Sequence, residues 1–157
     1  MEIVLSIIAI CLSVVSGAFA FYTFIWTARR DRKQATLEAF NRLQTEVFDY
    51  LNMYTPSEIA KICENTRSAD YKTISVYLAR IEHFCVGLNQ GIYDKETFFA
   101  LAHGYFDGQM LQKRIKPIID KKNQRNNTGE LFYNDTLAIM EWMSKKNKST
   151  HQQPSQS

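Results

Sequence analysis

Residues 3–26 read IVLSIIAICLSVVSGAFAFYTFIW, a run of 24 residues without a charge. Four cations follow within five residues, at Arg29, Arg30, Arg32 and Lys33. The hydrocarbon core of a bilayer is about 30 Å thick, and about 20 apolar residues of helix cross it. The run is therefore long enough to span a membrane with some tilt, and the sequence predicts a single-pass membrane protein.

Charge on the two sides of this span predicts its orientation. Only Met1 and Glu2 precede it, whereas the flank that follows is strongly basic, and Lys/Arg-rich flanks stay cytoplasmic. We expect a bacterial inner-membrane protein with a periplasmic N-terminus and residues 27–157 in the cytoplasm. Aromatic residues cluster at the cytoplasmic end of the span, as in an interfacial aromatic belt: Phe21, Tyr22, Phe24 and Trp26.

The alternative to a retained anchor is a cleaved signal peptide. The segment Ala18-Phe19-Ala20 has the small residues of a signal-peptidase site. However, no Lys or Arg precedes the apolar run, the run continues past Ala20, and a basic cluster follows it. We therefore favour the retained anchor.

Small residues recur every four positions in the span, at Ala9, Ser13 and Gly17. This spacing allows close approach of two helix backbones in lipid. A single span cannot form a pore, so an action on the membrane would require homo-oligomerisation through this stripe. The alternative is a monomeric anchor whose small residues face lipid.

The remainder of the chain is expected to be all-α and to form one helical domain. Its apolar residues recur at spacings of three and four, as on one face of a helix. We divide the chain into an anchor at 1–28, a cytosolic domain at 29–146 and a disordered tail at 147–157. The tail is assigned because its residues are polar and offer little to bury.

Helix boundaries are predicted from local signals. The first cytosolic helix covers 29–50 and can continue directly from the span, since no Pro or Gly intervenes. Thr55-Pro56-Ser57-Glu58 is a capping box with Pro at the first helical position. We expect a helix from Thr55 to near Arg67, one over 69–90 that Gly91 ends, and one that Asp94 caps. A segment over 110–122 should break near Lys116 because of Pro117. A polar loop over 123–129 and a helix over 130–145 should follow.

Sequence motifs give little support to catalysis or metal binding. Among the motifs absent are a Gly-rich phosphate loop, HExxH and GxSxG, and Cys11, Cys63 and Cys85 lack metal-ligand spacing. His83 adjoins Glu82, but adjacent helical residues do not share a face. We therefore expect no catalytic residue, no metal and no cofactor. An enzyme would need a pocket that gathers these candidates: Glu82, His83, His103 and Asp107.

Binding of an anionic ligand has better support. The candidate residues are a basic run with the polar residues that follow it, and one histidine near a glycine break: Lys113, Arg114, Lys116, Lys121, Lys122, Arg125, Asn126, Asn127, Thr128 and His103. Cations neutralise phosphates, and Asn can read adenine edges. Four aromatic residues offer stacking surfaces for bases: Tyr71, Tyr93, Phe106 and Tyr133. Charge runs are also common on solvated surfaces, and on these residues alone we favour that simpler interpretation.

Two resemblances extend this interpretation. Leu78-Ala79-Arg80-Ile81-Glu82-His83-Phe84, with the segment 87–94 that ends Gly91-Ile92-Tyr93-Asp94, resembles a segment of uncharacterised bacterial proteins with one N-terminal span and a helical cytosolic domain. The size and layout of the chain also resemble a membrane-anchored effector of type III CRISPR defence. That resemblance implies a tetramer that binds cyclic tetra-adenylate and perturbs the membrane, with no DNA partner.

We therefore expect a membrane-bound antiviral effector switched by a cyclic oligoadenylate. The partners would be the lipid bilayer, further copies of the chain and the nucleotide. The alternative is a membrane-anchored scaffold or inhibitor without a nucleotide ligand. It would recruit a protein through an exposed apolar groove near Phe98, Phe99 and Phe106.

Overall fold

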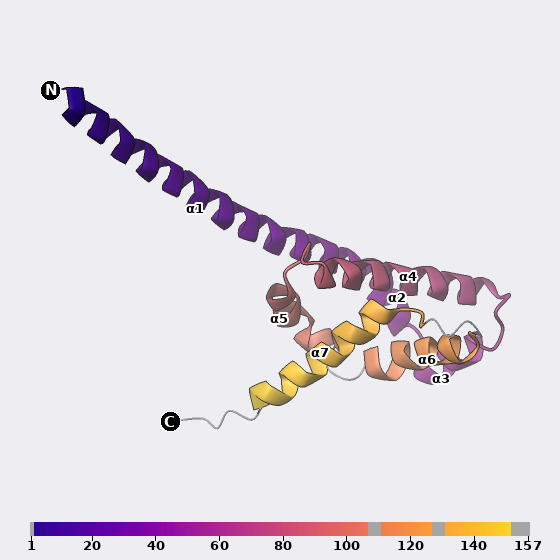
Figure 1. Cartoon of the computed structure of the whole chain (residues 1–157). Helices are drawn as coiled ribbons and strands as arrows, with labels where there is room; N and C mark the ends of the chain where they lie inside the picture. The colour runs from indigo at the N-terminus through magenta and orange to yellow at the C-terminus, as the bar shows by residue number, and fades with distance from the viewer. Residues whose placement is uncertain (1, 107–110, 127–130, 152–157) are drawn as a thin grey trace.

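A single long helix dominates the structure (Figure 1). The computed structural model describes residues 2–106, 111–126 and 131–151; the side chains at 2, 5, 103–106, 111, 150 and 151 are not among those described. Helix α1 covers Glu2–Leu43 and projects from the remaining helices. Its apolar part is long enough to span a membrane, lies near the N-terminus and buries nothing against the domain. The described residues thus contain one candidate membrane span, as the sequence predicts.

The helical path continues beyond α1 without a break. A π-helical turn, η1 (Gln44–Phe48), and α2 (Asp49–Asn52) follow it directly. The amide of Asp49 donates to the carbonyl of Gln44, five residues earlier, which defines the π turn. No Pro or Gly interrupts this stretch. The rod formed by α1, η1 and α2 therefore continues from the apolar segment into the hydrophobic core. The predicted boundary at 28/29 is therefore not a break in the helix.

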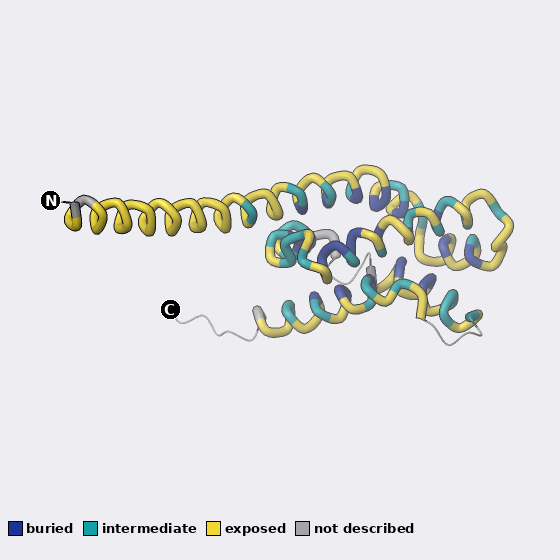
Figure 2. Tube along the Cα trace, turned by 45° about the horizontal axis from the view of Figure 1, so that its top comes forward, coloured by how far each residue is buried: buried dark blue, intermediate teal, exposed yellow. Residues whose placement is uncertain are grey.

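The remaining helices pack around the inner end of this rod. They are α3 (Pro56–Ile62), α4 (Ala69–Asn89), α5 (Lys95–Phe106), η2 (Leu111–Ile115), α6 (Lys116–Gln124) and α7 (Asn134–His151). Figure 2 shows buried residues on the facing sides of these helices, whereas the outer half of α1 is exposed throughout. The described residues include no strand, which confirms the all-α prediction.

Local sequence signals set several helix ends. Thr55 and Glu58 form the predicted capping box at the start of α3, in which each residue's side chain accepts from the other's backbone N–H. The pKa of Glu58 is lowered by its hydrogen bonds to Thr55. Gly91 has a φ of 72°, so it ends α4 in the left-handed region that glycine tolerates. Asp94 caps α5 by accepting the amide of Thr97 at 2.7 Å.

The structure differs from the predicted boundaries at three places. Helix α3 ends at Ile62 rather than near Arg67. The predicted break near Lys116 is a change from the π turn η2 to α6, with Pro117 in the first turn of α6. Helix α7 starts at Asn134 and runs to His151, through the start of the predicted tail. A Glu141–Lys145 pair four residues apart supports its last turns, and residues 152–157 lie outside the described part.

Candidate functional site

A cavity of about 420 Å³ lies where three segments meet, and we call it the tyrosine pocket. Its lining residues come from the approach to α4 and its first turn, the end of α6 and the segment before α7: Thr66, Tyr71, Lys122, Arg125, Asn126, Phe132 and Tyr133. Figure 1 shows the start of α4 and the end of α6 at the end of the domain opposite the N-terminus of α1. The described lining residues include two cations and no acid.

Lys122 is held between two tyrosine rings in this pocket. Its Nζ lies 5.4 Å from the ring centre of Tyr71 and 5.2 Å from that of Tyr133. The same ammonium donates to the hydroxyl of Tyr133 at 2.9 Å and to Oγ of Ser75 at 3.1 Å. Cation–π contacts and hydrogen bonds therefore fix one positive charge beside two aromatic faces.

Tyr133 has an unusual backbone conformation. Its φ of 63° is the one positive value among the described non-glycine residues, and such a conformation costs about 1–3 kcal/mol. Asn123 of α6 anchors the preceding residue, because its side chain accepts the amide of Phe132 at 2.7 Å and donates to the carbonyl of Phe132 at 3.3 Å. A strained residue held this way at a cavity wall supports a functional role.

Arg125 closes the pocket toward α3. Its guanidinium donates to the carbonyl of Cys63 at 3.3 Å, which leaves further N–H donors of the five in an arginine side chain. Burial raises the pKa of the Cys63 thiol, although Lys121, Lys122 and Arg125 act in the opposite direction. Cys63 is therefore a neutral buried thiol, and Arg125 is the second cation that a bound anion would meet.

A second basic cavity of about 360 Å³ lies on the other side of α6, against α3. Its cations are Lys113, Arg114 and Lys121. Arg114 donates to the carbonyl of Leu51 and to Oδ1 of Asn52, both at 2.9 Å, so it provides a hydrogen-bond donor to two acceptors at the C-terminal end of α2. Arg114 therefore has a structural role that the charge pattern alone did not reveal.

The predicted ligand residues are thus divided among several places. Arg125 and Asn126 line the tyrosine pocket together with the predicted stacking residues Tyr71 and Tyr133. Lys113 and Arg114 line the second cavity, whereas Lys116 is exposed and lines neither. Asn127 and Thr128 lie outside the described residues, as do the side chains of His103 and Phe106. Tyr93 packs elsewhere, stacked on Phe84 at 5.0 Å.

Sequence reasoning missed some residues of this pocket. Thr66 and Phe132 line it, and Asn123 positions Tyr133, yet none was a candidate. Phe132 and Tyr133 form an aromatic pair directly after a polar loop. These two adjacent aromatic residues were the available sequence signal for the pocket wall, because large aromatic side chains at the end of a loop need other residues to cover them.

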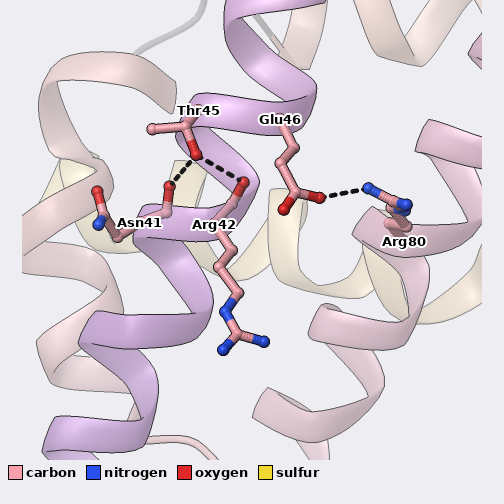
Figure 3. Close-up of polar contacts among 5 residues, drawn as sticks. All are labelled: Asn41, Arg42, Thr45, Glu46 and Arg80. Carbon is pink, nitrogen blue, oxygen red and sulfur yellow. Dashed lines mark hydrogen bonds and ion pairs between the residues drawn. The ribbon is translucent and has the colours of Figure 1, made fainter.

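A groove of about 460 Å³ separates α1 from α4. In Figure 3, Glu46 of η1 reaches across to form an ion pair with Arg80 of α4, and Arg42 points into the same space. Thr45 Oγ1 donates to the carbonyls of Asn41 at 3.1 Å and Arg42 at 3.3 Å. Acids and arginines balance in this lining, since Glu38 and Glu46 lie with Arg42 and Arg80, so the groove favours anions less than the tyrosine pocket does.

The acid–base candidates Glu82 and His83 do not come together. Glu82 accepts the amides of Asp135 at 3.1 Å and Thr136 at 2.9 Å, and the Thr136 hydroxyl at 2.6 Å. It therefore caps the start of α7. His83 is exposed and lines the α1–α4 groove. Within the described residues, no group of three His, Cys, Asp or Glu side chains could hold a metal.

The apolar residues considered for a protein scaffold differ in their exposure. Phe98 is fully buried and meets Phe40 and Phe84 edge to ring. Phe99 packs against Trp142 with 5.8 Å between ring centres. Phe98 is therefore not available to a protein partner, whereas Phe99 is only partly covered, and the side chain of Phe106 lies outside the described residues.

Comparison with known proteins gives one match. A family model described as a domain of unknown function (DUF4760) matches residues 8–142. The match includes most of the apolar segment and the helices from α1 into α7, so anchor and domain form one family unit. No curated protein and no solved structure matches the chain.

Proposed function

We propose that this chain, which belongs to the DUF4760 family, is a membrane-anchored receptor for an anionic ligand with an aromatic ring, best fitted by a nucleotide. The observation that carries the proposal is the tyrosine pocket. There Lys122 and Arg125 lie with the rings of Tyr71 and Tyr133, and no acid is among the described lining residues. This combination fits a phosphate and a base at once.

Each lining group has a role in such a complex. A base would stack on a tyrosine face, a contact worth about 1–3 kcal/mol. The guanidinium of Arg125 would form charge-assisted hydrogen bonds to a phosphate, and such bonds are about twice as strong as neutral ones. The side-chain amide of Asn126 offers both donors and an acceptor to the base edge. A cavity of about 420 Å³ is within the usual range for small-ligand sites.

The helices offer a route from this pocket to the membrane. Helix α4 begins at the pocket and runs along the inner end of the rod formed by α1 and η1. Polar contacts that join the rod to α4 and α5 include the Glu46–Arg80 pair and the bond from the Asp94 amide to Thr36. A ligand that binds two helix arrangements with different affinity would shift their populations, and α1 would carry the shift into the bilayer.

Orientation and assembly complete the proposal. We place the chain as a single-pass protein of the bacterial inner membrane, with its N-terminus in the periplasm, because the cations follow the span. Assembly would use Ala9, Ser13 and Gly17. The Ser13 hydroxyl is bonded within its own helix, to the carbonyl of Ala9, and an added Cβ at Gly17 would meet nothing within 4 Å. This open surface supports close packing of a second helix.

The narrowest form of the proposal is an antiviral effector that binds cyclic tetra-adenylate. It rests on the resemblance of layout described above. One tyrosine pocket is of a size for one nucleotide unit, so a cyclic tetranucleotide would engage pockets from several protomers. Ring-size specificity therefore requires an oligomer.

Calorimetry on the full chain in mild detergent tests the proposal. The probes are adenosine monophosphate, linear oligoadenylate and cyclic tetra-adenylate. The variant Arg125→Gln should weaken binding by about 10-fold or more, since a hydrogen bond to a charged group contributes about 1.5–3 kcal/mol. Lys116→Gln is the matched control and should bind as the unchanged chain does, because Lys116 is exposed outside both basic cavities.

Two outcomes would contradict the proposal. A folded chain that binds none of the three nucleotides would leave the membrane-anchored scaffold as the leading function. Equal loss of affinity in the Arg125 and Lys116 variants would show that binding is non-specific attraction to a basic surface. Dye release from proteoliposomes upon nucleotide addition then tests the membrane effect separately.

A further inference from the structure

The last turns of α7 extend beyond the hydrophobic core. Among the described side chains of this helix, Met143 is the last buried one, yet the helix continues to His151. Residues 144–151 contain three lysines and no acid, at Lys145, Lys146 and Lys148. Packing against the core does not explain the two exposed lysines of this segment, Lys145 and Lys148.

Contacts place this extension on the membrane side of the domain. Lys146 forms an ion pair with Glu96 in the first turn of α5, and α5 begins where Asp94 donates to Thr36 of α1. Thr36 follows Trp26, the last residue of the apolar run, by about 15 Å of helix at 1.5 Å per residue. Figures 1 and 2 both show the C-terminal end of α7 on the side of the domain from which the apolar part of α1 leaves.

Aromatic rings hold two lysines at this surface. Lys146 Nζ lies 4.7 Å from the ring centre of Phe99 and 5.2 Å from that of Trp142. Lys95 Nζ lies 5.9 Å from the same Trp142 ring. Tryptophan with lysine is typical of the bilayer interface, where an apolar body meets a polar layer.

We infer that this lysine surface, made of Lys95, Lys145, Lys146 and Lys148, binds the anionic phospholipid headgroups of the membrane that α1 spans. The inference goes beyond ligand binding and rests on the proposed membrane anchor. Charge supports it. With the basic cluster at 29–33, the membrane-side residues comprise eight cations against the acids Asp31, Asp94, Glu96 and Glu141, a net charge of +4.

Distance and tilt allow this contact. The headgroup layer adds about 5–7 Å on each side of the hydrocarbon core, and spanning helices are tilted by about 20° on average. A tilt toward α7 brings its end closer to the headgroups, within the Debye length of about 8 Å at physiological salt. Each lysine near an anionic surface then favours the docked state by about five-fold.

The test uses Trp142 as a probe of depth in the full chain. The Trp26→Phe variant leaves Trp142 as the one tryptophan. This protein is placed in bilayers of phosphatidylcholine, or of phosphatidylcholine with phosphatidylglycerol, that carry a quencher at the headgroup. We expect stronger quenching of Trp142 in the anionic bilayer, and we expect high salt to reverse the difference.

Lysine variants then identify the surface. Replacing Lys145 and Lys148 by Gln should lower the docked-to-free ratio by about 25-fold, the product of two five-fold effects. Both side chains are exposed, and their replacement leaves the contacts of Lys146 intact. The matched control replaces Lys61 and Lys116, which are exposed on α3 and α6, and should not change the quenching.

Equal quenching in the two bilayers would overturn the inference, as would unchanged quenching in the Lys145/Lys148 variant. Resistance to alkaline extraction is measured in both bilayers at the same time. A chain that resists extraction but shows no lipid-dependent quenching has the anchor without the lysine surface. A chain that is extracted lacks the anchor itself, which would contradict the proposed function as well.

Discussion

The hydroxyl of Thr36 accepts the backbone N–H of Asp94 at 2.8 Å, a bond between residues 58 positions apart. Thr36 is fully buried and also donates to the carbonyl of Arg32 at 2.7 Å. One small side chain therefore joins α1, the helix that carries the candidate membrane span, to the start of α5. This contact positions the basic cluster after the span relative to the rest of the domain.

Replacing Thr36 by Val should destabilise the protein by about 1–3 kcal/mol, because the buried amide of Asp94 loses its acceptor. Val is close to Thr in shape, so the loss reports the hydrogen bond rather than a cavity. Thr36→Ser keeps the hydroxyl and is the control. Urea denaturation of the full chain in detergent measures both, and equal stability of the Val and Ser variants would contradict this role.

The Asp94 cap should make stability depend on acid pH. The hydrogen bond to the Thr97 side chain is the main cause that lowers the pKa of Asp94, burial opposes it, and the Thr97 amide, Lys33 and Arg32 lower it further. A lowered folded pKa means that the carboxylate contributes stability above the unfolded value of about 3.9. This contribution is lost as the pH falls through the lower folded value.

The variant Asp94→Asn isolates this pH dependence, since Asn retains the cap without the charge. We expect the difference in unfolding free energy between the unchanged chain and the variant to be constant near neutral pH and to shrink below about pH 4. Denaturation at a series of pH values measures it. A difference that grows on acidification would show that the sign is wrong.

Removing the Glu82 carboxylate should loosen the start of α7. Its two oxygens accept three hydrogen bonds from Asp135 and Thr136, and the negative charge is favourable at a helix N-terminus. Glu82→Ala should cost about 2–3 kcal/mol. Hydrogen exchange should accelerate first at the amides of 135 and 136. Glu141→Ala, an exposed carboxylate of the same helix, is the control and should leave those amides protected.

Short-range signals were sufficient for much of the fold. The capping box at Thr55, the left-handed Gly91 and the cap at Asp94 each depend on residues within one turn. The π turn at Gln44–Phe48 has no such signal. The role of Glu82 depends on residues more than 50 positions away, so local sequence signals could not identify its partners.

The candidate site was predictable only in part for the same reason. Arg125, Tyr71 and Tyr133 were candidates by type, and the fold brings them to one pocket. Neighbours in sequence nevertheless face different cavities. Lys121 lines the cavity against α3, and Lys122 lines the tyrosine pocket, because consecutive helical residues do not share a face.

At Gly87, helix α4 lies close against the ring of Tyr93. A Cβ built at Gly87 would lie 2.5 Å from Cε2 of the Tyr93 ring. That ring is stacked on Phe84 at 5.0 Å between centres, so a movement away from the new Cβ would disturb this stack. Gly87→Ala should therefore destabilise the protein by about 1–3 kcal/mol through overpacking, although alanine is the better helix former.

A double-mutant cycle with Tyr93→Ala tests the cause. Once the ring is removed, Gly87→Ala should no longer destabilise, and the higher helix propensity of alanine should stabilise by up to about 1 kcal/mol. The two substitutions should then be non-additive, as expected for residues in contact. Urea denaturation of the four proteins measures the coupling. If Gly87→Ala costs the same with and without the tyrosine ring, the cost arises from the α4 backbone and not from the contact with Tyr93.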